Sequence, residues 1–207
     1  MGFVCLLEVC AFGSTVRIMP LGDSITRGYY TGVTASTYNG YRKELKLLLE
    51  AGGYEVDFVG GEEDGNFTDK QHEGHNGWHA DQAGTDDDIL GRITGWLTAT
   101  PADIALLHIG TNDILMEEEN ADEVSDILDN IFAANSNATV VLALIINADP
   151  DGTGWNSNRY IRVSTYNSNL NVMAEARIAA GDDIILVDME HGAGIDYASA
   201  DMVGFHP

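Results

Sequence analysis

Three short segments of this sequence hold residues that together could carry out acyl transfer. They are Gly22-Asp23-Ser24, a loop that contains Gly77 and a turn that contains Asn112. A serine on a sharp turn exposes its hydroxyl as a nucleophile, and Gly22 permits such a turn. The backbone N–H groups of Ser24 and Gly77 and the side-chain amide of Asn112 would then form a three-donor oxyanion hole. Asp23 is predicted to brace the nucleophile turn.

The apolar residues alternate between strand-like and helix-like segments. Apolar patterns predict strands at 16–21, 55–59, 104–109, 140–146 and 184–187, of which 104–109 and 140–146 are continuous apolar runs. Helices are predicted at 41–49, 86–97, 121–134 and 160–179. Five strands that alternate with helices predict one α/β domain, a three-layer α/β/α sandwich with a five-stranded parallel sheet of the flavodoxin-like kind.

For two of the predicted helices, the sequence also predicts a buried face or an N-cap. In the first, Tyr41, Leu45, Leu48 and Leu49 share one helical face, which predicts a buried apolar stripe. In the second, Thr85 is predicted to cap the N-terminus, and three aspartates follow in the first turn, where the helix dipole favours them.

The three candidate segments lie where a parallel sheet collects its ligands. Ligands in open α/β sheets bind beyond the carboxyl ends of the strands. Ser24 follows the first predicted strand, Gly77 lies in a long polar loop at 61–84 after the second, and Asn112 follows the third. This convergence is the main reason to interpret the segments as one site, because each alone is more typical of an ordinary turn.

At these positions the sequence resembles the GDSL/SGNH hydrolases. Met19-Pro20-Leu21-Gly22-Asp23-Ser24-Ile25-Thr26 is similar to their first block, and Gly110-Thr111-Asn112-Asp113 to their third. Glu73-Gly74-His75-Asn76-Gly77-Trp78 is similar to the second block of carbohydrate esterase family 3, the acetylxylan esterases. The resemblance covers about residues 16–207. It implies Ser24 as the nucleophile and Ser24, Gly77 and Asn112 as the oxyanion hole, with no metal and no organic cofactor.

The catalytic base is expected near the C-terminal end of the sequence. The family's last block is Asp-x-x-His, and its counterpart here contains His206 as the expected base. Val203 stands three residues before it, so we expect Asp201, or a backbone carbonyl, to orient the imidazole. A rival base is His191, which has the Asp-x-x-His spacing to Asp188 but directly follows the fifth predicted strand.

The two ends of the chain depart from the core pattern. Residues 1–15 are interpreted as a leader or tag-like segment, although they have no basic start and Glu8 interrupts their apolar stretch. The hydrolase domain is assigned to 16–207, in which the closing C-terminal helix expected from the resemblance is apparently missing. Cys5 and Cys10 do not have metal-site spacing.

Charge and hydropathy restrict the partners. The sequence has 10 Lys and Arg against 33 Asp and Glu, a formal net charge of −23. Such a surface repels nucleic acid and anionic lipid, and no apolar run reaches the ~18 residues of a membrane span. A neutral substrate and a secreted protein are expected, while the oligomeric state is left open.

A metal centre is not expected. The run from His72 to His79 invites a zinc interpretation, but the zincin pattern needs histidine at position 76, which is Asn76. The acidic runs lack the spacing of an EF-hand calcium loop.

The sequence therefore predicts a serine esterase for small acyl esters, most simply acetyl groups on xylan or a related polysaccharide. The alternatives are a general GDSL esterase, lipase or lysophospholipase, and an inactive SGNH-like domain that only binds carbohydrate. Trp78, Trp155, Tyr29 and Tyr30 are candidates for stacking on sugar rings.

Overall fold

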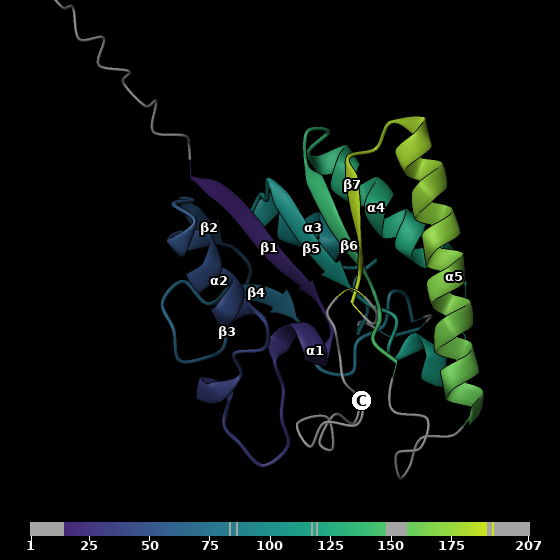
Figure 1. Ribbon diagram of the computed structural model, residues 1–207, viewed down its shortest axis with the longest axis horizontal. Helices are drawn as coiled ribbons and strands as arrows, with labels where there is room; N and C mark the ends of the chain where they lie inside the picture. The colour runs from purple at the N-terminus through teal and green to yellow at the C-terminus, as the bar shows by residue number, and fades with distance from the viewer. Residues whose placement is uncertain are drawn as a thin grey trace, which may run out of the picture.

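The computed structural model describes residues 15–82, 84–85, 87–116, 118, 120–147, 157–189 and 192, without the side chains of 157 and 158. Figure 1 shows a central twisted sheet with helices on both faces. The strands are β1 Val16–Gly22, β2 Val56–Phe58, β3 Glu62–Glu63, β4 Gln71–Gly74, β5 Ile104–His108, β6 Thr139–Leu144 and β7 Ile184–Asp188. The α-helices are α1 Ser24–Arg27, α2 Arg42–Ala51, α3 Ile93–Ala99, α4 Asp122–Ala134 and α5 Ser157–Ala180. Two 3-10 turns, η1 Ala35–Thr37 and η2 Asp113–Met116, complete the elements.

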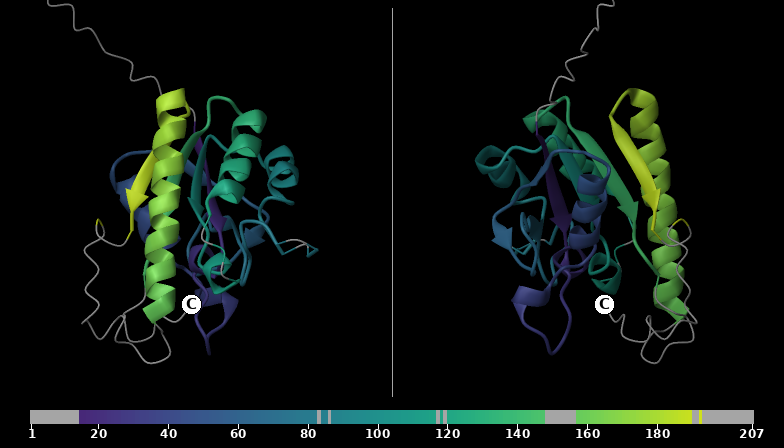
Figure 2. Two further views of the ribbon diagram at one scale, coloured as in Figure 1. Left: turned by 90° about the vertical axis from the view of Figure 1, so that its right-hand side faces the viewer. Right: turned by 60° about the vertical axis from the view of Figure 1, so that its left-hand side comes forward.

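The sheet confirms the predicted α/β/α class. Its order is β3-β4-β1-β5-β6-β7, and β2 also pairs with β1. All pairings are parallel except that of β3 with β4. Helices α3, α4 and α5 lie on one face and α2 on the other, as the two views of Figure 2 show. The described helices include none that is long and apolar enough to cross a membrane.

One side of β1 is shared by two short strands, and Pro20 lies where the partner changes. Val59 N–H donates to the Ile18 carbonyl beside β2, and His75 N–H donates to the Gly22 carbonyl beside β4. In a strand, the backbone N–H and C=O groups of residues two apart face the same neighbouring strand. The backbone nitrogen of Pro20 therefore faces the gap between β2 and β4. A proline has no N–H to offer a ladder, and this position demands none.

The predicted loop at 61–84 contains two strands, so that part of the prediction was wrong. β4 has the sequence Gln-His-Glu-Gly, which has no apolar pattern, yet three of its four residues are buried. His72 Nδ1 accepts the Gly74 N–H at 2.9 Å, and Glu73 accepts the Gly61 N–H. Each of these buried polar side chains has at least one hydrogen-bond partner, which hydropathy does not reveal.

The predicted helix at 86–97 was also wrong, because α3 begins only at its end. Thr85, the predicted cap, lies in a turn. Ile89 N–H donates to the His79 carbonyl at 3.1 Å, and the next N–H donates to the Ala80 carbonyl at 2.9 Å. These backbone donors are used in strand-like pairing, so the segment cannot also form the predicted helix.

Helix α2 forms where predicted, but Tyr41, Leu45 and Leu49 of the predicted stripe are only half-buried, and two basic side chains are buried more deeply. Leu48 of the predicted apolar stripe is 70% exposed. The buried residues of α2 are Arg42 and Lys46. Lys46 Nζ donates to the Val56 carbonyl at 2.6 Å and pairs with Asp69. Arg42 and Lys46 thus attach α2 to adjacent segments of the same chain by hydrogen bonds to backbone carbonyls and to one carboxylate.

The main core lies between the sheet and helices α3, α4 and α5. On α4 the residues that are buried follow the 3.6-residue period and are Val124, Ile127, Leu128 and Ile131. They pack with alternate residues of the strands in one hydrophobic cluster, which includes Ala105, Leu107, Val140, Leu142 and Ile184. This core fixes the ends of β1 and β5, from which two of the candidate segments extend.

Candidate active site

The nucleophile turn is held by a close approach and a helix cap. A Cβ at Gly22 would lie 2.0 Å from the His108 carbonyl oxygen, so only glycine fits at the end of β1. Asp23 follows as the N-cap of α1, and its Oδ1 accepts the Ile25 N–H at 2.8 Å. Ser24 is therefore the first residue of a short helix, where its N–H has no acceptor within that helix.

Asp23 lies beneath the turn rather than in the open site. Its side chain is fully buried, and burial raises the pKa of its carboxyl, an effect that His108 partly opposes. His108 of β5 is itself buried, and burial lowers the pKa of its imidazole. These positions suit Asp23 for the predicted bracing of the turn.

The loop after β4 brings Gly77 to the same edge of the sheet. A Cβ at Gly74 would lie 2.5 Å from the Arg27 backbone nitrogen, so glycine lets β4 pack directly against α1. Gly77 has φ +77°, a conformation that favours glycine, and a Cβ there would meet no atom within 4 Å. The space beside Gly77 is thus open to a ligand.

The third segment is joined to the second by two side-chain bonds. Asn112 Nδ2 donates to the Trp78 carbonyl at 2.8 Å. Asp113 Oδ1 accepts the Ala80 N–H at 2.8 Å. The amide nitrogen of Asn112 carries two hydrogens, so one remains for a ligand.

Gly110 lets that segment pack closely against the core. A Cβ there would lie 2.3 Å from the ring of Tyr166, whose hydroxyl donates to the Ile109 carbonyl at 3.0 Å.

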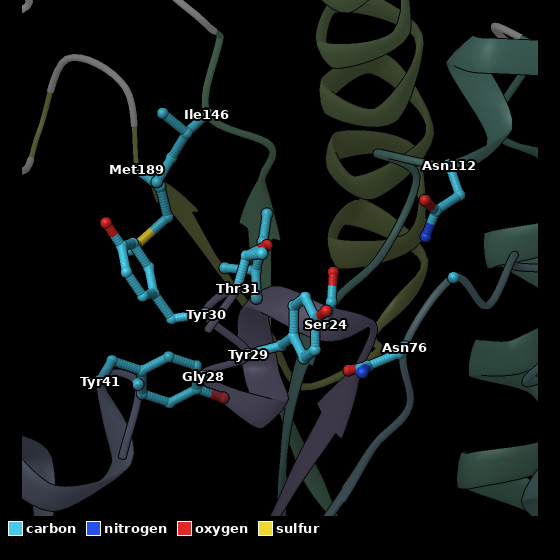
Figure 3. A pocket seen from close by; sticks show the side chains of 13 residues that line it. Ser24, Gly28, Tyr29, Tyr30, Thr31, Tyr41, Asn76, Asn112, Ile146 and Met189 are labelled. Carbon is cyan, nitrogen blue, oxygen red and sulfur yellow. The ribbon is translucent and has the colours of Figure 1, made fainter. Parts of the chain in front are cut away.

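A pocket of about 1000 Å³ unites the predicted nucleophile with both predicted oxyanion partners. Its lining consists of Ser24, Ile25, Gly28, Tyr29, Tyr30, Thr31, Gly40, Tyr41, Asn76, Gly77, Asn112, Ile146 and Met189. Figure 3 shows Tyr30, Ile146 and Met189 on one side of Ser24, and Asn76 and Asn112 on the other. The pocket therefore has an apolar side and an amide-bearing side, with a serine between them.

The predicted base falls outside the described residues. His206 and Asp201, and likewise His191, lie in parts of the chain that the structure does not describe. The described chain reaches the pocket from β7, which ends at Asp188, because Met189 lines the pocket. The choice among these histidines stays a prediction.

The histidine-rich segment is not arranged as a metal centre in the described structure. His72 lies in β4, where burial lowers the pKa of its imidazole to about 3. The His75 ring stacks on Trp78 at 4.1 Å and on Trp96 at 4.9 Å between ring centroids. Both tryptophans pack against the core, so the prediction of Trp78 as a sugar platform has little support. Trp155 lies outside the described residues.

Sequence reasoning missed one residue that shapes this pocket. Arg42 is fully buried and donates to five backbone carbonyls, those of Thr26, Arg27, Tyr38, Asp64 and Lys70. Two of these carbonyls belong to α1, the helix that begins with Ser24. An arginine in a helix rich in Lys and Glu has no signal in sequence that marks it for burial.

A family model matches most of the described domain. The model of the GDSL-like Lipase/Acylhydrolase family matches residues 21–207. This chain belongs to that family. The match agrees with the geometry, because the pocket gathers the two glycine-containing segments and Asn112 around Ser24.

Relatives of the family add detail. The chain is 31% identical over 217 residues to a multidomain esterase of Ruminococcus flavefaciens, covering 93% of this chain and 26% of that protein. It thus spans about a quarter of that relative's length.

Among solved structures, a Clostridium thermocellum family 3 carbohydrate esterase has a TM-score of 0.71 at 31% identity, with 88% of this chain and 81% of that one covered. A carbohydrate esterase family 3 protein of Talaromyces cellulolyticus has a TM-score of 0.67 at 28% identity, covering 91% and 87%. An acetyl esterase solved with acetate ion has a TM-score of 0.67 at 27% identity, covering 91% and 87%.

Proposed function

We propose that this GDSL-family esterase removes acetyl groups from xylan or a related polysaccharide, with Ser24 as the nucleophile. The observation that carries the proposal is the pocket, in which Ser24 lies between an apolar side and the amide of Asn112. The similarity to family 3 carbohydrate esterases and to an acetyl esterase solved with acetate supports the acetyl group.

The proposed reaction begins with attack of the Ser24 hydroxyl on the ester carbonyl. His206 takes the hydroxyl proton and passes it to the leaving sugar oxygen, and Asp201 orients the imidazole. The N–H groups of Ser24 and Gly77 and the amide of Asn112 donate to the oxyanion. Water then attacks the carbonyl of the acetyl-enzyme. His206 takes a proton from this water and returns it to the Ser24 oxygen as acetate leaves.

The pocket wall suits a neutral sugar ester better than a lipid. Tyr29 and Tyr30 are 46% and 58% exposed at the rim, where aromatic rings can stack on a sugar. The net charge of −23 favours an uncharged substrate over an anionic one. The apolar side chains of Ile146 and Met189 in the lining offer a surface for the methyl group of an acetyl ester.

The test compares acetyl and octanoyl nitrophenyl esters, followed by acetate release from acetylated xylan. We expect acetyl turnover to exceed octanoyl turnover, and Ser24→Ala to lower kcat by about 10³-fold or more. Ser164→Ala, an exposed serine on α5, is the matched control and should leave kcat unchanged. His206→Ala should nearly abolish activity, whereas His191→Ala should cost less than about tenfold.

Other results would select other functions. A preference for octanoyl esters would indicate a lipase or general esterase. Lack of turnover by folded wild type, with xylan binding retained, would indicate a carbohydrate-binding domain. Full activity of folded Ser24→Ala would overturn the mechanism in either case.

A further inference from the structure

A group of three carboxylates lies directly behind the oxyanion segment. Asp113 begins η2, Glu118 follows η2, and Glu123 lies in the first turn of α4. Each offers one carboxylate oxygen, and these oxygens all lie within 4.8 Å of one another. Within the described residues this is the only such group of three or more acidic, histidine or cysteine side chains.

One member of this group is buried, whereas Glu118 is exposed and Glu123 is half-buried. Asp113 is only 1% exposed. Its Oδ1 accepts the Ala80 N–H, but its buried Oδ2 has no hydrogen-bond partner among the described residues. A buried carboxylate oxygen without a donor is costly, and such oxygens are found where an ion completes the set.

The charged neighbours that shift the pKa of Glu123 are carboxylates. Glu123 has a pKa raised to about 7, first by burial and then by Asp113, Glu118, Asp81 and Asp122. Burial also raises the pKa of Asp113 to about 6, and the nearby His79 only partly opposes this. Burial and the neighbouring carboxylates therefore both oppose a full negative charge on the group.

We propose that Asp113, Glu118 and Glu123 bind one Ca²⁺ ion between η2 and the first turn of α4. The ligands are all carboxylate oxygens, which suit a hard cation. Opposite ligands of Ca²⁺ stand about 4.6–5.2 Å apart, twice the usual 2.3–2.6 Å bond, so one ion spans the group as it stands. Mg²⁺ demands strict octahedral geometry with bonds of about 2.0–2.1 Å and dehydrates reluctantly, so we expect it to bind more weakly.

The ion would brace the segment that carries Asn112. Asp113 follows Asn112 directly, and its other oxygen already holds the Ala80 N–H. A cation that joins Asp113 to Glu123 would tie this segment to α4, which is anchored in the core. The site supports the fold beside the pocket and takes no part in the ester chemistry.

The experiment titrates EDTA-treated protein with CaCl₂ at constant ionic strength, followed by calorimetry and by Tm. We expect one Ca²⁺ per chain, with a Kd of about 10⁻³ M or tighter. At a hundredfold excess over Kd, Tm should rise by roughly 5–10 °C. Equal MgCl₂ should give a smaller rise.

The matched variants are Glu123→Gln and Glu175→Gln, which remove the same charge inside and outside the group. Glu175 is exposed on α5 and bonds to Asn171. Glu123→Gln should weaken Ca²⁺ binding at least tenfold, whereas Glu175→Gln should bind like wild type. Equal Tm rises for both variants, or equal effects of Ca²⁺ and Mg²⁺, would show diffuse screening and overturn the site.

Discussion

Two buried charges flank the pocket, and the structure satisfies them very differently. Arg42, on the α2 side, is fully buried, and its five N–H groups donate to five carbonyls. Asp113, on the side of η2 and α4, is equally buried, but one of its oxygens has no hydrogen-bond partner in the described part of the chain. The first charge has a complete set of ligands within the chain, and the second has not.

The difference assigns the two sides different tasks. The Arg42 side is closed by the protein alone: burial lowers the pKa of the guanidinium only to about 10, so it stays protonated at neutral pH. Two of its carbonyl partners belong to α1, the helix that begins with Ser24. The other three are those of Tyr38, Asp64 and Lys70. The Asp113 side depends on something further, a proton at low pH or a cation at neutral pH.

The largest expected effect comes from breaking the complete side. Arg42→Met would leave five buried carbonyls without their donor, at a cost of about 3–5 kcal/mol or more. For a chain of this size that corresponds to a loss of roughly 10–20 °C in Tm, measured by calorimetry. The adjacent Lys43→Met, which removes one exposed bond to Asn66, should change Tm by no more than about 2 °C.

Arg42→Lys keeps the charge but not the geometry, and it should fall between the two. If Arg42→Met kept the wild-type Tm, the carbonyl ligands would not be what holds this side, and the contrast between the two sides would fail.

The next largest effect is expected in catalysis, at Asn112 beside Asp113. Asn112→Ala removes an oxyanion donor and should lower kcat by about 10²–10³-fold with little change in KM, because that donor acts mainly in the transition state. It also removes the bond to the Trp78 carbonyl, so Tm is measured in parallel. Asn76→Ala, another amide of the pocket lining, is the comparison and should cost less than tenfold. A change confined to KM would mean that Asn112 only positions substrate.

The same contrast shows what the sequence could and could not predict. Continuous apolar strands such as β5 and β6 and the 3.6-residue stripe of α4 were predicted within a residue or two, because hydropathy determines their burial. The short motifs around Ser24 and Asn112 could be found because chemistry fixes their residue types and spacing.

Buried polar residues could not be predicted from hydropathy. β4 was missed because His72 and Glu73 are polar yet buried, and the burial of Arg42 and Lys46 on α2 was missed because hydropathy predicts exposure for such side chains. Arg42 collects carbonyls from segments up to 28 residues away, and Asp113 meets Glu123 only when η2 and α4 fold together. No local pattern records such meetings.

The smallest expected effect is the pH response of the Asp113 side in the absence of metal. The folded pKa of Glu123, about 7, exceeds its ordinary value of 4.5. Between these values the folded protein keeps a proton that the unfolded chain releases, so stability falls as pH rises through this window. In EDTA, wild type should lose on the order of 1–3 °C more in Tm between pH 5 and pH 8 than Glu123→Gln, because much of the Glu123 side chain is exposed and screened. His72, whose pKa is lowered to about 3, has the opposite sign but is present in both proteins and cancels in the difference. Parallel pH curves for the two proteins would mean that Asp113, Glu118, Asp81 and Asp122 do not repel Glu123 enough to matter.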